Sequence, residues 1–288
     1  MTGLSVFAII VLVGAAGFFA RSHYERKHFE TKKYVIYSKK LKRQELNLLF
    51  LSDLHNNEFG TDNEKLIKEI ERIKPDAVLI GGDMIVGKGE IDLRVTSHLV
   101  RALSSRFPVY YGNGNHEQRM GGTEKYLETY EQFTEVLHQA GAHYLSDESI
   151  LLGEDVVITG CNLEEDYYRH RFTIPKFTEE MIKCHVGTAD RSRFQILLLH
   201  SPLFFDSSSK WGADLTLSGH FHGGTIRLPF LGGVMTPQYQ FFLPACAGRF
   251  DREDKTLIVS PGLGTHSINI RFNNRPQLIW VQIRKEQL

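Results

Sequence analysis

Residues 47–55 read NLLFLSDLH, an apolar run that ends in an aspartate and a histidine. The same form recurs in AVLIGGD (residues 77–83) and VYYGNGNH (residues 109–116). A short apolar run bounded by turn residues is typical of a buried β-strand. In open α/β sheets, ligands bind at the carboxyl ends of such strands. The polar residues that these three segments would bring to one sheet edge are Asp53, His55, Asp83, Asn115 and His116.

Two later apolar runs end in histidines. Residues 194–199 lead to His200, and residues 214–218 lead to the turn GHFHGG, which contains His220 and His222. Asp-x-His, Gly-Asp or His-x-His alone is a weak signal, because each is common in turns. Together and in this order, each after an apolar run, they indicate one site assembled from five strands.

The remainder of the chain has the pattern of an α/β domain, which we expect to cover residues 45–288. Helical spacing of apolar residues occurs over residues 63–74 and 126–139, between the strand-like runs. The predicted strands are Leu48–Leu51, Ala77–Ile80, Val109–Tyr111, Val156–Thr159, Ile196–Leu199, Leu215–Leu217, Leu257–Ser260 and Leu278–Ile283.

The residue types of this site predict a metal centre with nitrogen and oxygen ligands. The candidate ligands are Asp53, His55, Asp83, Asn115, His200, His220 and His222. Such donors suit Mn, Fe, Zn or Co, and seven are too many for one ion and enough for two divalent ions. Asp83 is the candidate bridge because its Gly-Gly-Asp turn permits close backbone approach. His116 is the candidate catalytic group, as a proton donor or a stabiliser of the transferring phosphoryl group.

The motifs Asp53-x-His55, Gly82-Asp83, Gly114-Asn115-His116-Glu117, His200 and Gly219-His220-x-His222 resemble those of the calcineurin-like metallophosphoesterase superfamily. The resemblance covers about residues 45–285. It implies an α/β four-layer sandwich of two mixed β-sheets flanked by helices, with a two-metal site that hydrolyses phosphoric esters. It also implies that Asp53, His55, Asp83 and His222 hold one ion, that Asp83, Asn115, His200 and His220 hold the other, and that His116 is the catalytic histidine.

Within that superfamily the chain is similar to a single-domain bacterial branch associated with the membrane or cell wall. The shared features include Ser52–His55, the Gly219–Gly224 turn and the segment Ser260–Thr265. Thr225, Glu117 and Phe221 depart from the usual pattern of the branch. None of the three is a candidate ligand, so the departures bear on substrate preference and leave hydrolysis as the expected reaction.

Candidate substrate-binding residues are weaker. Arg119 and Arg227 could hold a phosphate or be solvated, and His266 follows a Gly-Leu-Gly turn near the expected site. The apolar run Leu228–Ala247 could be core, loop or a lip over the site that suits a lipid-like substrate.

The N-terminal region predicts one membrane helix. Residues 4–20 carry no charge, and at 1.5 Å per residue they would span about 26 Å. Basic residues follow this run rather than precede it, which favours an uncleaved single anchor with the domain in the cytoplasm. A cleaved export signal and a buried helix are the alternatives. We expect residues 21–44 to form a basic linker between anchor and domain.

Composition excludes other classes. Lys plus Arg and Asp plus Glu both number 34, so the net charge is zero and nucleic acid is not an expected partner. Cys161, Cys184 and Cys246 match no disulfide scaffold or zinc site. The expected function is therefore a phosphodiesterase acting near the membrane. The alternatives are a nucleotide-linked lipid pyrophosphatase, as in lipid A precursor processing, and a non-catalytic, metal-stabilised membrane scaffold. The sequence does not determine the oligomeric state.

Overall fold

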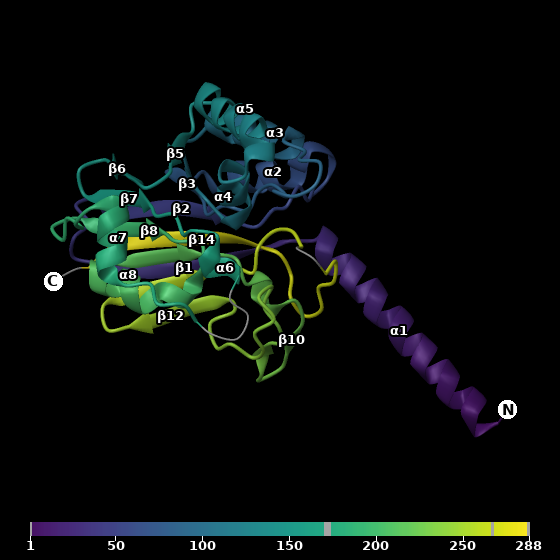
Figure 1. Ribbon diagram of the computed structural model, residues 1–288. Coiled ribbons are helices and arrows are strands. Elements are labelled where there is room, and N and C mark those ends of the chain that lie inside the picture. The colour runs from purple at the N-terminus through teal and green to yellow at the C-terminus, as the bar shows by residue number, and fades with distance from the viewer. Residues whose placement is uncertain (1, 170–173, 266–267, 287–288) are drawn as a thin grey trace.

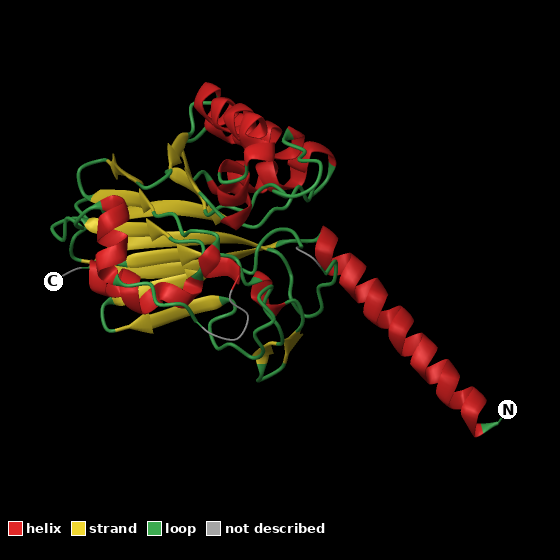
Figure 2. Cartoon of the chain, in the orientation of Figure 1, coloured by secondary structure: helices red, strands yellow, loops and turns green. Residues whose placement is uncertain are grey.

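The computed structural model describes residues 2–169, 174–265 and 268–286. Two six-stranded sheets pack face to face, and helices cover the outer face of each (Figures 1 and 2). Both sheets contain parallel and antiparallel pairs. The predicted α/β sandwich of mixed sheets between helices is confirmed.

The first sheet contains the strands that carry the first three motifs. Its order is β1 (Glu30–Ser38), β14 (Gln277–Lys285), β2 (Glu45–Leu51), β3 (Ala77–Ile80), β4 (Val109–Gly112) and β5 (His143–Leu145). Side chains alternate between the two faces of a strand, so Leu48 and Phe50 face the second sheet while Leu49 and Leu51 face the helices. Those helices are α2 (Glu64–Ile73), α3 (Arg94–Ser104) and α5 (Leu127–Gln139).

The second sheet carries the histidine motifs. Its order is β12 (Gly248–Arg252), β13 (Lys255–Val259), β9 (Leu215–Ser218), β8 (Phe194–Leu198), β7 (Val156–Gly160) and β6 (Glu148–Leu152). Helices α7 (Glu179–Val186) and α8 (Phe205–Trp211) pack on its outer face. The shorter elements are α4 (Asn115–Gly121), α6 (Asp166–Arg169), β10 (Arg227–Leu228) and β11 (Gly232–Gly233).

All eight predicted strands and both predicted helices are present, with ends that differ by a few residues. In the two six-stranded sheets, the strands that the apolar pattern missed are β1, β5, β6 and β12, which lie at the sheet edges. The two-residue strands β10 and β11 were also missed. Edge strands are only partly covered: β6 and β12, for example, contain no fully buried residue. Their sequences are therefore too polar to be recognised as buried strands.

The N-terminal segment is more regular than we expected. Helix α1 (Gly3–Lys27) runs beyond the apolar residues, where Arg21 and Glu25 form an i, i+4 ion pair (2.7 Å). Residues 30–38 form β1, which pairs in parallel with β14. The linker predicted over residues 21–44 is thus largely helix and strand. Helix α1 is long and apolar enough to cross a membrane, and signal sequences share this property.

The apolar run Leu228–Ala247 folds as a projecting hairpin and loop. Its polar residues Thr236 and Gln238 are buried, whereas Phe230, Phe241 and Phe242 are exposed. The polar side chains turn toward the domain and the aromatic ones turn to the outside. In a core segment the aromatic side chains would be buried and the polar ones exposed. The expectation that part of this run is core therefore holds only for a few residues such as Cys246.

Candidate metal centre

The five motif-bearing strands end at one place. Asp53 and His55 follow β2, Asp83 follows β3, and the others follow in the same way: Asn115 and His116 after β4, His200 after β8, and His220 and His222 after β9. All of these side chains are buried. The sheets therefore bring together residues up to 169 positions apart in the sequence.

The backbone at this point is strained. Five of the candidate ligands have φ between 45° and 65°, a left-handed conformation that is uncommon outside glycine: Asp53, His55, Asp83, His220 and His222. Such residues cluster at functional sites, where each costs on the order of 1–3 kcal/mol. Gly82 lies at φ 84°, and a Cβ there would be 1.9 Å from the backbone nitrogen of Gly114. The ends of β3 and β4 can approach each other this closely only because Gly82 has no side chain.

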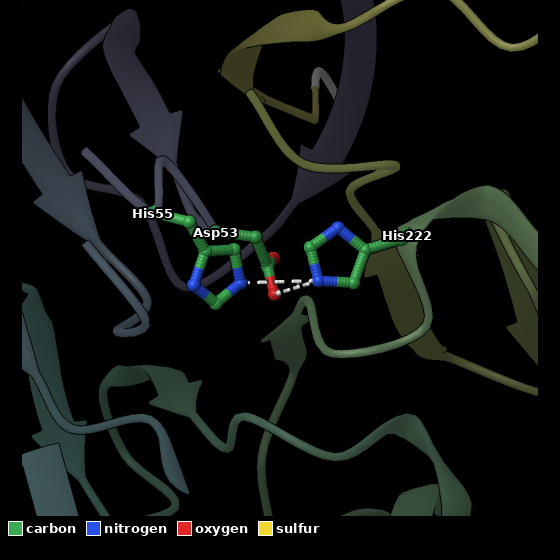
Figure 3. Close-up of side chains that lie close together, drawn as sticks. All are labelled: Asp53, His55 and His222. Carbon is green, nitrogen blue, oxygen red and sulfur yellow. Dashed lines mark hydrogen bonds and ion pairs between the residues drawn. The ribbon is translucent and has the colours of Figure 1, made fainter. Parts of the chain in front are cut away.

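Asp53, His55 and His222 form one cluster of potential ligands (Figure 3). The two Nε2 atoms of His55 and His222 lie 3.2 Å apart, and Nε2 of His222 lies 3.5 Å from Oδ1 of Asp53. Three donor atoms that converge within 4.8 Å of one another are close enough to share one ion.

A second cluster consists of Asp83, His200 and His220. Nε2 of His200 lies 3.2 Å from Oδ2 of Asp83, and the same oxygen lies 3.8 Å from Nε2 of His55 in the first cluster. Asp83 therefore faces both clusters, as a bridging carboxylate must. The buried Oδ1 of Asn115 has no hydrogen-bond partner among the described residues, which fits an oxygen kept for an ion.

Hydrogen bonds to the backbone orient the imidazoles. Nδ1 of His200 donates to the carbonyl oxygen of Gly81 (2.7 Å), and Nδ1 of His55 lies 3.2 Å from the carbonyl oxygen of Ile85. A carbonyl only accepts, so Nδ1 carries the proton in both rings and Nε2 is the atom directed at the cluster. In His116 the two ring nitrogens have the opposite roles, because Nδ1 accepts a hydrogen bond from the N–H of Gly87 (2.7 Å). The proton of neutral His116 is therefore on Nε2.

His116 also lies close enough to two candidate ligands to hold a metal ion with them. Its ligand atom lies within 4.8 Å of those of His55 and Asp83, and its ring contacts that of His55 edge to face with centroids 4.9 Å apart. The backbone N–H of His116 donates to Oδ1 of Asp83 (2.8 Å). The geometry alone allows both a catalytic and a ligand role for this histidine.

Burial and mutual charge interactions shift the pKa values of the clustered carboxylates and imidazoles. Burial disfavours the charged imidazole of His200, but the carboxylate of Asp83 still raises the pKa of His200 to about 10. Burial also opposes ionisation of Asp83, yet His200, His116 and His55 hold the pKa of its carboxyl well below the usual range. Burial raises the pKa of Asp53 to about 6. To hold a metal ion, the imidazole of His200 would have to be neutral, because a metal ligand must be deprotonated.

Glu117 belongs to one of the sequence motifs, but the sequence assigned it no role at the site. Its buried carboxylate accepts from the backbone N–H groups of Asp83 (2.8 Å), Met84 (3.0 Å) and Gly114 (3.0 Å), and from the hydroxyl of Tyr111 (2.8 Å). These bonds tie the loop after β3 to the loop after β4. Burial raises the pKa of Glu117, and the negative charge of Asp83 raises it further. Glu117 thus positions Asp83 through the backbone N–H of that residue.

Comparison with known proteins agrees with this geometry. The family model described as calcineurin-like phosphoesterase matches residues 46–224, which is more than half of the chain and includes all the candidate ligands. The chain belongs to the calcineurin-like phosphoesterase family. It is accordingly a hydrolase that acts on phosphoric esters, and the resemblance noted from the motifs is confirmed.

Known proteins match most of the chain. An uncharacterised metallophosphoesterase of Aquifex aeolicus is 28% identical over 96% of this chain and 98% of its own length. The phosphodiesterase YaeI of Escherichia coli is 24% identical over 82% of this chain and 81% of its own. The solved structure of TT1561 from Thermus thermophilus superposes with a TM-score of 0.49 at 11% identity, over 76% of this chain and 90% of that one.

The three candidate substrate-binding residues of this phosphoesterase, Arg119, Arg227 and His266, do not lie together. Arg119 lines a hollow of about 720 Å³ together with His55 and His116, and it pairs with Glu165 (3.1 Å). Arg227 donates to the carbonyl oxygen of Gly223 (3.1 Å) and lines a hollow that contains none of the candidate ligands. His266 lies outside the described residues. Of the two arginines, only Arg119 therefore lies beside the metal centre.

Proposed function

We propose that this phosphoesterase is a two-metal phosphodiesterase that acts at the membrane surface. The observation that carries the proposal is the position of Asp83, whose Oδ2 faces His200 of one cluster and His55 of the other. A single carboxylate between two ligand sets is the arrangement that would let one residue help to hold two ions.

The ligand sets would divide around this carboxylate. Asp53, His55, Asp83 and His222 would hold one ion, and Asp83, Asn115, His200 and His220 the other. The imidazole, carboxylate and amide donors fit Mn, Fe, Zn or Co. When bound, two such ions would supply charge neutralisation for the phosphate and an activated water.

His116 is proposed to act on the leaving oxygen. Its Nδ1 accepts from the N–H of Gly87, so the proton of the neutral ring lies on Nε2, which is the proposed donor. Donation of this proton to the departing alkoxide or phenoxide would stabilise the leaving group. The His116 backbone N–H, bonded to Asp83, holds the imidazole next to the bridging carboxylate.

A diester is the proposed substrate class. The hollow beside His55 and His116 is large enough to accept a second substituent on the phosphate. Lys88 supplies positive charge along it, whereas Arg119 and Arg169 both pair with Glu165 on the same wall. The similarity to the phosphodiesterase YaeI supports the same choice.

Location at a membrane is supported by α1 and by the hairpin. Helix α1 projects from the domain with its apolar residues exposed (Figure 1). Exposed Phe230, Phe241 and Phe242 on the hairpin add an apolar surface that suits contact with lipid, and a lipid-like substrate is part of this proposal. The basic residues after position 20 favour a cytoplasmic domain. Export after signal cleavage is the alternative topology.

The proposed reaction can be tested with the full chain in detergent and added Mn²⁺. We expect the kcat/KM for bis-p-nitrophenyl phosphate to exceed that for p-nitrophenyl phosphate by about tenfold or more, because the site accommodates a second ester group. Chelation should abolish both activities. CDP-diacylglycerol, a nucleotide-linked lipid pyrophosphate, serves as the third substrate.

The outcomes separate the alternatives. Preferred hydrolysis of CDP-diacylglycerol would favour the lipid pyrophosphatase. Binding of two ions without turnover of any substrate would favour the scaffold. A preference for the monoester, or turnover that survives chelation, would contradict the proposal.

A further inference from the structure

The last two turns of α1 are docked on the phosphoesterase domain. Ser22 and Glu25 are buried, although the rest of the helix is largely exposed. The ring of Phe18 stacks on that of Phe272 with centroids 4.9 Å apart. In Figure 1 the helix leaves the domain from this contact as a straight rod. The contact therefore holds the base of the helix at a defined place on the domain.

Polar contacts fasten this base to the loop before β14. The carboxylate of Glu25 accepts from the backbone N–H groups of Asn273 (3.1 Å) and Asn274 (2.9 Å), and from Nε of Arg21 (2.7 Å). The hydroxyl of Ser22 accepts from the N–H of Arg271 (3.1 Å). Hydrogen bonds to a buried carboxylate are among the stronger ones, so the helix base and the loop form one unit.

The same loop supports a candidate metal ligand. Nδ2 of Asn274 donates to the carbonyl oxygens of His222 (2.7 Å) and Thr225 (3.2 Å). The buried guanidinium of Arg271 donates to the carbonyl oxygens of Pro261 (2.7 Å) and Gly262 (3.2 Å). Asn274 is therefore the single residue between Glu25 of the helix and His222 of the metal centre.

This docking places Arg26 beside the metal centre. Arg26 lines a hollow of about 240 Å³ whose wall includes His55, Asn57, Thr265 and Arg271. Lys27 lies on the same wall, and no aspartate or glutamate is among the described lining residues. The hollow thus carries positive charge next to a candidate ligand of the first ion.

The guanidinium of Arg26 has no internal partner among the described residues. Its buried Nε lacks a hydrogen bond, and neither an ion pair nor a hydrogen bond joins Arg26 to any residue in the described ranges. This is unlike Arg21, which pairs with Glu25, and Arg271, which is held by backbone carbonyls. A partly buried guanidinium without a partner is suited to bind an external anion, because arginine presents several donors in a fixed plane.

We propose that Arg26 binds an anionic group of the substrate, so that the membrane helix supplies part of the substrate site. The inference rests on the proposed function for the placement of the reacting phosphate beside His55. The substrate class is then a phosphoester that carries a second negatively charged group, such as another phosphate. Arg26 lies six residues beyond Ala20, about 9 Å along a helix, which places this group at the headgroup level of a bilayer.

The test compares two ligands that differ only in a second phosphate. Binding of thymidine 3′,5′-bisphosphate and thymidine 5′-monophosphate to the Mn²⁺-loaded full chain in neutral detergent is measured by calorimetry. The wild type is expected to bind the bisphosphate about tenfold more tightly, and Arg26→Ala should reduce this ratio to less than about twofold. Arg26→Lys should restore part of it.

The matched control is Lys32→Ala, which removes an exposed positive charge from β1 outside the hollow. It should leave the ratio unchanged. An unchanged ratio in Arg26→Ala would overturn the inference, as would an equal loss in Lys32→Ala. So would an effect of Arg26→Ala that is confined to association with vesicles containing phosphatidylglycerol, since Arg26 would then bind lipid headgroups alone.

Failure of the proposed function is a separate result. If the bisphosphate ratio depends on Arg26 but bis-p-nitrophenyl phosphate is not hydrolysed, the binding site stands and the diesterase assignment fails. Because Arg26 makes no polar contact within the described residues, Arg26→Ala should unfold at the temperature of the wild type, which thermal denaturation checks.

Discussion

Asp83→Asn should lower kcat for bis-p-nitrophenyl phosphate by on the order of 10³-fold. Asp83 faces both ligand clusters, and the amide nitrogen of asparagine can neither bridge two cations nor balance their charge. The variant should also lose at least one of the two bound ions, which elemental analysis of the purified chain would measure.

The fold should survive this substitution. Oδ1 of Asp83 accepts from the backbone N–H of His116 (2.8 Å), and the oxygen of asparagine can accept the same bond. Asp254→Asn is the matched control, because that carboxylate is 76% exposed on the turn between β12 and β13. Retention of two ions and of wild-type kcat in Asp83→Asn would show that Asp83 is not the bridge.

His116→Ala should lower kcat by about 10²–10⁴-fold and leave both ions bound. The expected cause is loss of the proton on Nε2, whose position follows from the bond between Nδ1 and the N–H of Gly87. The effect should be larger for an alkyl diester than for bis-p-nitrophenyl phosphate, since p-nitrophenolate leaves readily without a proton. Kinetics with both substrates, together with a metal count, provide the measurement.

His98→Ala is the control for this substitution, because His98 is an exposed histidine on α3. The structure also allows His116 to act as a ligand with His55 and Asp83. Loss of one ion in His116→Ala would indicate that ligand role. An equal loss of rate for good and poor leaving groups would exclude proton donation.

The convergence of the site follows from simple features of the sequence. Each of the first three motifs ends an apolar run of about four to five residues, and β2, β3 and β4 are parallel neighbours. Neighbouring parallel strands end at the same sheet edge, so Asp53, Asp83 and Asn115 had to meet there. The histidines of the second sheet join them because the two sheets pack face to face.

The supports of the site could not be predicted in the same way. Glu117 was visible as part of a motif, but its four donors come from Asp83, Met84, Gly114 and Tyr111 only after the loops have folded. Such contacts have no periodicity, and no local propensity encodes them.

The docked base of α1 is a further example. Glu25 and Asn274 are 249 positions apart, and residues 21–27 look like an ordinary charged flank of an apolar helix. Their burial depends on the loop at residues 271–274, which has no pattern of its own. Strand β1 was missed because it lies at a sheet edge and carries Lys32 and Lys33, whose side chains are both exposed to solvent.

The two-ion centre is tested most directly by titrating the metal-free full chain with Mn²⁺ while bound metal and hydrolysis of bis-p-nitrophenyl phosphate are followed together. We expect two ions per chain, no activity without metal, and full activity only when the second ion is bound. Full activity with one ion or with none would contradict the two-ion centre.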